Sequence, residues 1–252
     1  MHIKGKVMLS TVKTLSLIAA GLLSAQTFAW GDMPLQNTKN LTLNAKSLSA
    51  LKVEAGSGFL HITGSDTDEV TVKAEIYQDQ PHDEYCLGLE AKGSNAELSA
   101  GQCDYHTNKQ TRIDLTVSIP RSFNVNVHDG SGEIIIRKAA NTVINDGSGS
   151  IEAIDIQGTL EINDGSGSIN VRNVSRDIKI HDGSGNIDVA HTQGNINVHD
   201  GSGGIDLNDI AGDVVISDGS GSIRVDKAAN FELLSDGSGS VNVTNILGKT
   251  TL

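Results

Sequence analysis

The chain has 252 residues, with 19 Lys and Arg against 31 Asp and Glu, and a formal net charge of −12. This acidic balance argues against nucleic acids and anionic lipids as partners, because both require a basic face on the protein. Cations, cationic surfaces and neutral glycans are the partner classes that the charge allows.

The first 29 residues have the features of a secretory signal peptide. Three Lys residues make the start basic, and residues 15–23 form a mostly apolar run that is too short to span a bilayer. Thr27 and Ala29 supply small residues at the −3 and −1 positions of a cleavage site, so cleavage is expected after Ala29. No later run is apolar enough for a membrane helix. The sequence therefore predicts an exported protein, either periplasmic or secreted to the cell surface, without membrane insertion.

After the signal peptide, the sequence predicts a lead-in over residues 30–48 and one β-solenoid domain over residues 49–252. A weak first copy of the later repeat occurs in residues 56–62, where Gly-Ser-Gly is followed by alternating apolar residues. The alternating pattern of residues 69–76 predicts the strand that follows.

Residues 77–112 interrupt the repeat and are predicted to form an excursion from the solenoid. The segment contains both Cys residues of the chain, Cys86 and Cys103, and all three Tyr residues. In an oxidising compartment an isolated Cys pair is most simply a disulfide, and the alternative is a metal site that adds His82 and His106. This segment is the least repetitive part of the predicted surface, so a specific protein partner would be expected to bind here.

From residue 129 onward the phrase D-G-S-G occurs seven times at nearly constant spacing. Successive copies are 17 residues apart once and 18 residues apart thereafter. The Asp residues that begin the seven copies are Asp129, Asp146, Asp164, Asp182, Asp200, Asp218 and Asp236. A fixed period of this kind predicts a stack of identical supersecondary units.

Each 18-residue unit has the pattern of a strand, a turn, a second strand and a second turn. In one unit Ile169 and Val171 alternate with polar residues, and Ile178 and Ile180 do so before the next phrase, which indicates half-buried strands. One unit cannot bury its apolar face alone, whereas stacked units bury a continuous column. Because aromatic residues make up only 3% of the chain, the interior should be narrow. The sequence therefore predicts an all-β fold, a single flattened parallel β-solenoid with 18-residue coils.

The repeated phrase has a structural interpretation as one turn of each coil. Gly adopts positive φ without steric cost, and Asp and Ser side chains bond to nearby backbone N–H groups. Identical turns then stack on one another, so the same residues recur. In this interpretation the Asp carboxylates brace the turn and direct their charge to water.

The alternative is that the seven Asp residues of the phrases, from Asp129 to Asp236, bind calcium. Stacked carboxylates about 4.8 Å apart repel one another, and a bound cation would remove that cost. However, the calcium-binding nonapeptide repeat places its Asp after the last Gly, whereas here the Asp precedes both glycines. Ca²⁺ also takes six to eight oxygens, more than one such turn supplies. No other cofactor is expected.

The histidines beside the phrases raise two further chemical hypotheses. The sequence H-D-G-S-G contains His, Asp and Ser, but a hydrolytic triad also needs a cleft and an oxyanion hole, and Asn or Ser replaces the His in most copies. The chain is therefore predicted not to be an enzyme. A transition-metal site from His181 and His199 on adjacent coils, with Asp182 and Asp200, is geometrically allowed, and a solvated ladder is the alternative.

The last coil carries one misfit, because Glu232 falls in a column of core residues. A local slip of the register that buries Phe231 and Leu233 instead would repair it. The sequence ends at Leu252, part-way through a coil, which would leave unpaired strand groups at this end. End-to-end self-association, or a partner that caps this end, is therefore expected.

The repeated pattern G-S-G-x-I-x-V and the stretch LTVSIPRSFNVNVHDGSGEI, behind a signal peptide, resemble the bacterial "putative adhesin" family of β-strand-repeat domains of unknown function. The resemblance covers residues 49–252. It implies an exported stack of short strands without an established catalytic role, and it transfers no site residues. The predicted function is a non-enzymatic scaffold for adhesion or surface interaction with a glycan or a protein, and a calcium-binding repeat protein is the alternative.

Overall fold

The computed structural model of the protein describes residues 33–103 and 109–252. The predicted signal peptide, residues 1–29, lies outside the described residues, and so does His106. The regular elements of the described part are all strands. No helix in this part of the chain is long and apolar enough to cross a membrane.

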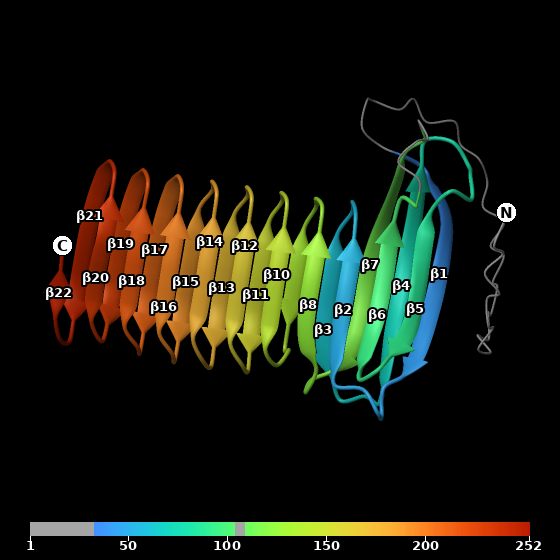
Figure 1. Ribbon diagram of the computed structural model, residues 1–252, viewed down its shortest axis with the longest axis horizontal. Helices are drawn as coiled ribbons and strands as arrows, with labels where there is room; N and C mark the ends of the chain where they lie inside the picture. Colours follow the sequence, from blue (N-terminus) through green and yellow to red (C-terminus); the bar gives the residue numbers. More distant parts are fainter. Residues whose placement is uncertain (1–32, 104–108) are drawn as a thin grey trace, which may run out of the picture.

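Two 11-stranded sheets face each other along the length of the molecule (Figure 1). Sheet A contains, in spatial order, β1 (Leu35–Asn44), β4 (Glu69–Gln78), β7 (Thr111–Pro120), β3 (Leu60–Ser65), β9 (Ile134–Arg137), β11 (Ile151–Ile156), β13 (Ile169–Val174), β15 (Ile187–Thr192), β17 (Gly203–Ile210), β19 (Gly221–Ala228) and β21 (Gly239–Ile246). Sheet B contains, from the same end, β5 (Cys86–Lys92), β6 (Asn95–Gly101), β2 (Ala50–Ala55), β8 (Asn124–Asp129), β10 (Thr142–Asp146), β12 (Leu160–Asp164), β14 (Ile178–Asp182), β16 (Ile196–Asp200), β18 (Val214–Asp218), β20 (Phe231–Asp236) and β22 (Thr250–Thr251).

From β8 onward the chain forms regular coils, each with one strand in sheet B and one in sheet A. Every strand pairs in parallel with the equivalent strand of the next coil: Ile178 of β14 lies opposite Ile196 of β16, and Asp182 lies opposite Asp200. Both pairs are separated by 18 residues in the sequence. The predicted parallel β-solenoid with 18-residue coils is therefore confirmed.

The core between the sheets consists of columns of aliphatic side chains. Ile162, Ile180 and Val198 from sheet B and Val171 and Val189 from sheet A are fully buried. β-Branched residues suit strands because their stiff side chains pack well on a pleated surface. Full burial of one such side chain stabilises a fold by roughly 1.5–3 kcal/mol, so the repeated columns are the main force that holds the coils together.

The N-terminal end departs from this regular stack, and chain order no longer follows spatial order (Figure 1). The strands β2 and β3 form the coil next to β8 and β9, and Ser57 pairs with Ser131. The weak first copy of the repeat therefore joins the column of D-G-S-G turns. Beyond this coil, β4 pairs antiparallel with both β1 and β7, so antiparallel strands close this end of sheet A.

Residues 77–112, the segment predicted as an excursion, include β5, β6 and the start of β7. The strand β6 continues sheet B in parallel with β2, and β5 folds back antiparallel onto β6. Cys86 and Cys103 form the predicted disulfide, with an S–S distance of 2.01 Å. In the disulfide both sulfur atoms are bonded to each other and are not thiolate ligands, so the alternative Cys–His metal site is not formed. His82 Nε2 lies 3.1 Å from Thr111 Oγ1.

The misfit at Glu232 is resolved by the register slip that the sequence predicts. Phe231 lies opposite Val214 and Leu233 lies opposite Ile216, and the register shifts immediately after Ile216. Phe231 is buried, whereas Glu232 is exposed. The slip returns Asp236 to its place opposite Asp218, so the column of turns continues without a break.

Candidate functional site

The D-G-S-G phrase forms the turn from sheet B to sheet A in each coil, named here the glycine turn. In one coil Asp182 Oδ1 accepts a hydrogen bond from the N–H of Ser184 at 3.1 Å, and four other coils repeat this bond at 3.0 to 3.3 Å. The last Gly of the phrase has positive φ, 149° at Gly167. A Cβ added there would lie 1.5 Å from the carbonyl oxygen of Gly149 in the preceding coil, so only Gly fits.

The prediction that these Asp carboxylates face water is wrong for the five central coils, whereas Asp129 is half-buried and Asp236, in the last coil, is exposed. Side chains alternate between the two faces of a strand, so Asp182 points inward with Ile180. The side chains of Asp146, Asp164, Asp182, Asp200 and Asp218 are only 4–8% exposed. These five residues and Asp129, named here the aspartate column, each have a buried Oδ2 atom without a hydrogen-bond partner among the described residues.

Burial within the aspartate column raises the pKa of its carboxyl groups. Desolvation is the larger cause and the charge of neighbouring Asp residues the smaller, and together they raise the pKa of Asp129 to about 7 and that of Asp146 and Asp182 to about 6. Burial also raises the pKa of Asp164, Asp200 and Asp218. The column therefore retains protons at a pH where exposed Asp residues are ionised.

The aspartate column gives no support to the calcium hypothesis. Within the described residues, no group of three or more His, Cys, Asp or Glu side chains is arranged to hold a metal ion. One oxygen of each carboxyl is already used by the turn. The other supplies one oxygen per coil, whereas Ca²⁺ takes six to eight.

The opposite turn of each coil, from sheet A to sheet B, carries a feature that sequence reasoning missed. One residue at the end of the sheet A strand in each regular coil, where the chain begins this turn, has a φ angle between 55° and 66°. We name the corner that this residue forms the left-handed turn. The residues in this conformation are Lys138, Asp155, Asn173, His191, Asp209, Lys227 and Asn245. Asn and Asp tolerate this conformation better than most residues. They hold four of the seven positions, 18 or 36 residues apart, and this spacing was the available signal.

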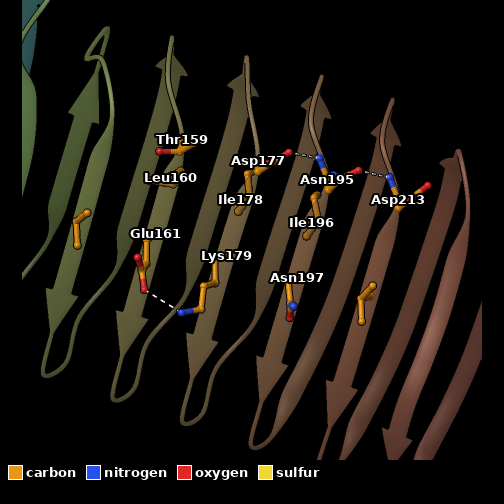
Figure 2. Close-up of a pocket in the computed structure, with 12 residues that line it drawn as sticks. Thr159, Leu160, Glu161, Asp177, Ile178, Lys179, Asn195, Ile196, Asn197 and Asp213 are labelled. Atoms are coloured by element: carbon orange, nitrogen blue, oxygen red, sulfur yellow. Dashed lines mark hydrogen bonds and ion pairs between the residues drawn. The ribbon is translucent and has the colours of Figure 1, made fainter.

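Next to the left-handed turns, a ladder of Asp and Asn side chains ties each coil to the next. Asp177 Oδ1 accepts a hydrogen bond from the N–H of Asn195 at 2.8 Å, and Asn195 Oδ1 accepts one from the N–H of Asp213 at 2.9 Å (Figure 2). Asn141 makes the equivalent bond to Thr159 at 3.0 Å. These side chains satisfy backbone groups that the turns leave unpaired.

A hollow of about 500 Å³ lies on the outer face of sheet B, across β10 to β18. The ladder forms one side of it, and the outward residues at the middle of each strand form the other (Figure 2). Lys179 and Glu161 on neighbouring strands form an ion pair at 3.1 Å, and Asn197 follows in the same row and is exposed. The hollow therefore presents charged and amide groups at the spacing of adjacent strands.

A second row on the outer face of sheet B contains the histidines beside the glycine turns. His181 and His199 lie opposite each other on β14 and β16, with their rings stacked at a centroid distance of 4.8 Å. Burial, followed by the charges of His199 and Lys179, lowers the pKa of His181. Asp182 and Asp200 point inward, so the structure keeps the two histidines together and separates them from the acids that sequence reasoning grouped with them.

Comparisons with known proteins match the chain to one family model and to several solved structures. The model of the family described as Toastrack DUF4097 matches residues 87–251. A "putative adhesin" from Bacteroides fragilis is 16% identical, with a TM-score of 0.45 and coverage of 88% of this chain and 99% of that one. A "putative adhesin" from Parabacteroides distasonis is 16% identical, with a TM-score of 0.48 and coverage of 82% and 97%. No curated protein matches the chain.

Proposed function

The chain belongs to the Toastrack DUF4097 family, and from this premise we propose that it is an exported, non-enzymatic β-solenoid that binds a repetitive, hydroxyl-rich glycan. The resemblance to a bacterial family of unknown function is confirmed by the family match. The family supplies no ligand, so the proposal depends on the surface of this chain. The observation that carries it is the hollow on the outer face of sheet B.

The hollow suits an extended polymer better than a small molecule. It is open along five parallel strands (Figure 2). The polar side chains of its middle row come from the three central strands, and Val143 and Val215 line its two ends. Carboxylate, ammonium and amide groups such as those of Glu161, Lys179 and Asn197 form hydrogen bonds with hydroxyl groups. A polymer that crosses several coils would make several weak contacts at once, and such contacts multiply in affinity. The net charge of −12 favours a neutral or cationic glycan over an anionic one.

A binding role fits these side chains better than a catalytic one. Glu161 is held in an ion pair by Lys179, and the Asp177 carboxylate accepts a backbone hydrogen bond. Acid–base catalysis instead requires a titratable group within reach of a bound substrate in a site that excludes water. The disulfide between Cys86 and Cys103 supports export, because structural disulfides persist in oxidising compartments.

A co-sedimentation assay with insoluble cellulose and with chitosan beads tests the proposal. Asn197→Arg places a long side chain in the hollow, and Asn170→Arg makes the same change at an exposed position of β13 in sheet A. We expect the unmodified chain and the Asn170→Arg variant to bind equally, and binding of Asn197→Arg to fall at least about tenfold, a loss of about 1.4 kcal/mol. Equal binding by the two variants, or no binding of the unmodified chain to either polymer, would contradict the proposal.

A further inference from the structure

The pair formed by His181 and His199 occupies a distinct place in the row beside the glycine turns. On the side toward the N-terminus, the row contains two amide side chains that bond to each other, with Asn163 Nδ2 donating to Asn145 Oδ1 at 3.1 Å. On the other side the hydroxyls pair with each other, with 2.5 Å between Ser217 Oγ and Ser235 Oγ. Neither imidazole is hydrogen-bonded to any residue in the described part of the chain. The row therefore contains two adjacent imidazoles whose polar atoms are not used by the fold.

The backbone holds these two imidazoles in register. His181 and His199 are direct partners in the parallel pairing of β14 and β16, and their ring planes differ by only 5° at a centroid distance of 4.8 Å. Both side chains are partly exposed and line a shallow hollow of about 410 Å³ together with residues of the adjacent glycine turns. A ligand from solvent can therefore reach both rings.

We propose that His181 and His199 form a two-imidazole site for a divalent transition-metal ion of the Zn²⁺, Ni²⁺ and Cu²⁺ group. Imidazole is a preferred ligand of these ions, and a metal–nitrogen bond is about 2.0–2.1 Å long. Two nitrogens bound to one tetrahedral ion are therefore about 3.3 Å apart. The rings start parallel and 4.8 Å apart at their centroids, and the lone pair that binds a metal lies in the ring plane. Both side chains must therefore rotate about χ1 and χ2 until the two ring planes converge on the ion, which their partly exposed positions allow.

The surroundings favour a cation and leave coordination positions for solvent. The chain carries a net charge of −12, so its overall field attracts positive ions. Near the pair, Glu161 and Lys179 form an ion pair with each other, so their charges largely offset. The acids that follow the histidines, Asp182 and Asp200, point into the core and do not complete the site. Nitrogen ligands discriminate against Ca²⁺ and Mg²⁺, which prefer oxygen, so this site is chemically different from the calcium site that the sequence raised.

Calorimetric titration of the purified chain, without a His tag, with Zn²⁺ is the first test. We expect one saturable site, and we expect His181→Gln and His199→Gln each to weaken it at least about 100-fold, because a single imidazole loses the advantage of paired ligands. Ca²⁺ should not compete. All variants should keep the Tm of the unmodified chain, because both side chains point away from the core.

Two matched variants separate this pair from the other histidines of the chain. His128 stands in the same row but lies between Glu54 and Asn145, so His128→Gln should leave Zn²⁺ binding unchanged. Asn145→His creates a second adjacent pair with His128 and should add one equivalent of Zn²⁺. With Cu²⁺, electron paramagnetic resonance should show two coordinated nitrogens in the unmodified chain and one in each single variant.

The proposal is overturned if the double variant His181→Gln, His199→Gln binds Zn²⁺ with the affinity and stoichiometry of the unmodified chain. It is also overturned if Asn145→His adds no site, because the argument from register would then fail. Glycan binding is measured separately through Asn197→Arg, so failure of either proposal leaves the other standing.

Discussion

The two turns of each coil arrange their side chains in opposite ways. In the glycine turn the aspartate column repeats one charged residue, and the carboxyl groups are buried. In the left-handed turn the equivalent column is exposed and mixed: Asp209 lies 2.9 Å from His191 Nδ1 and 2.5 Å from Lys227 Nζ. Residues of like charge therefore stack in the buried glycine turn, and residues of unlike charge stack in the exposed left-handed turn. Electrostatics alone would favour the reverse, because repulsion between like charges is strongest where water is excluded.

Backbone geometry explains this inversion. In the glycine turn the Asp Oδ1 braces the bend, and the glycines leave no space for another solution, so every coil repeats the same residues. Two charges about 4.8 Å apart repel by about 3.5 kcal/mol at an effective dielectric constant of about 20. Protonation is the available relief, and the raised pKa values of Asp129 and Asp146 reflect it. In the left-handed turn the side chains extend into solvent, so their identity is free to vary.

The largest expected effect comes from breaking the glycine turn itself. In Gly167→Ala the new Cβ would meet the carbonyl oxygen of Gly149 at 1.5 Å, so neighbouring coils must separate, and we expect a loss of at least about 4 kcal/mol in the free energy of unfolding. In the left-handed turn, Asn173→Ala should cost only about 1–2 kcal/mol, the penalty for a left-handed residue. Urea unfolding of the two variants measures this difference. Equal losses would show that the two turns are equally constrained.

Raising the pH should lower the Tm by an intermediate amount. The folded pKa of Asp146 and Asp182 is about 6, above the ordinary Asp pKa of 3.8, so between these pH values the folded state holds more protons than the unfolded state. The column's contribution to stability is fully present below pH 3.8 and is lost as the pH rises through about 6 to 7. We therefore expect the Tm to fall between about pH 4 and pH 7.

Removing the charge should flatten this pH dependence. In Asp146→Asn the amide oxygen can still accept the bond from Ser148, and the amide nitrogen replaces the unpaired Oδ2. We expect the variant to be more stable than the unmodified chain at pH 8 by on the order of 1–3 kcal/mol, with little difference at pH 4. Asp206→Asn, at a partly exposed position of β17, serves as the control and should show no such difference. A parallel pH profile for Asp146→Asn and the unmodified chain would contradict a protonated column.

The same contrast shows how much of the molecule the sequence could predict. Periodicity alone predicts the coils, the core residues and even the slip at Phe231, because each is dictated by side-chain alternation. Alternation also places Asp182 on the inward face with Ile180, although burying an ionised carboxylate is costly. The raised pKa of Asp182 resolves this conflict, because the buried carboxyl can stay protonated. The antiparallel pairing of β1 with β4 was not predictable, because it depends on contacts between segments that no repeat relates. The His181–His199 pair followed from the 18-residue spacing, whereas the hollow on sheet B depends on the size of outward side chains in five strands.

The smallest expected effect comes from imposing like charge on the left-handed turn. Lys227→Asp places a second carboxylate beside Asp209 in the exposed column, and Lys227→Asn removes the ion pair without adding charge; both residues tolerate the φ of 66° found there. Exposed charges are screened by salt within about 10 Å at 0.1 M ionic strength, so we expect Lys227→Asp to lower the Tm slightly in low salt and to match Lys227→Asn in high salt. A large loss that persists in high salt would mean that this column is sheltered as the aspartate column is. The identity of its residues would then be a requirement of the fold, and the distinction between the two turns would not hold.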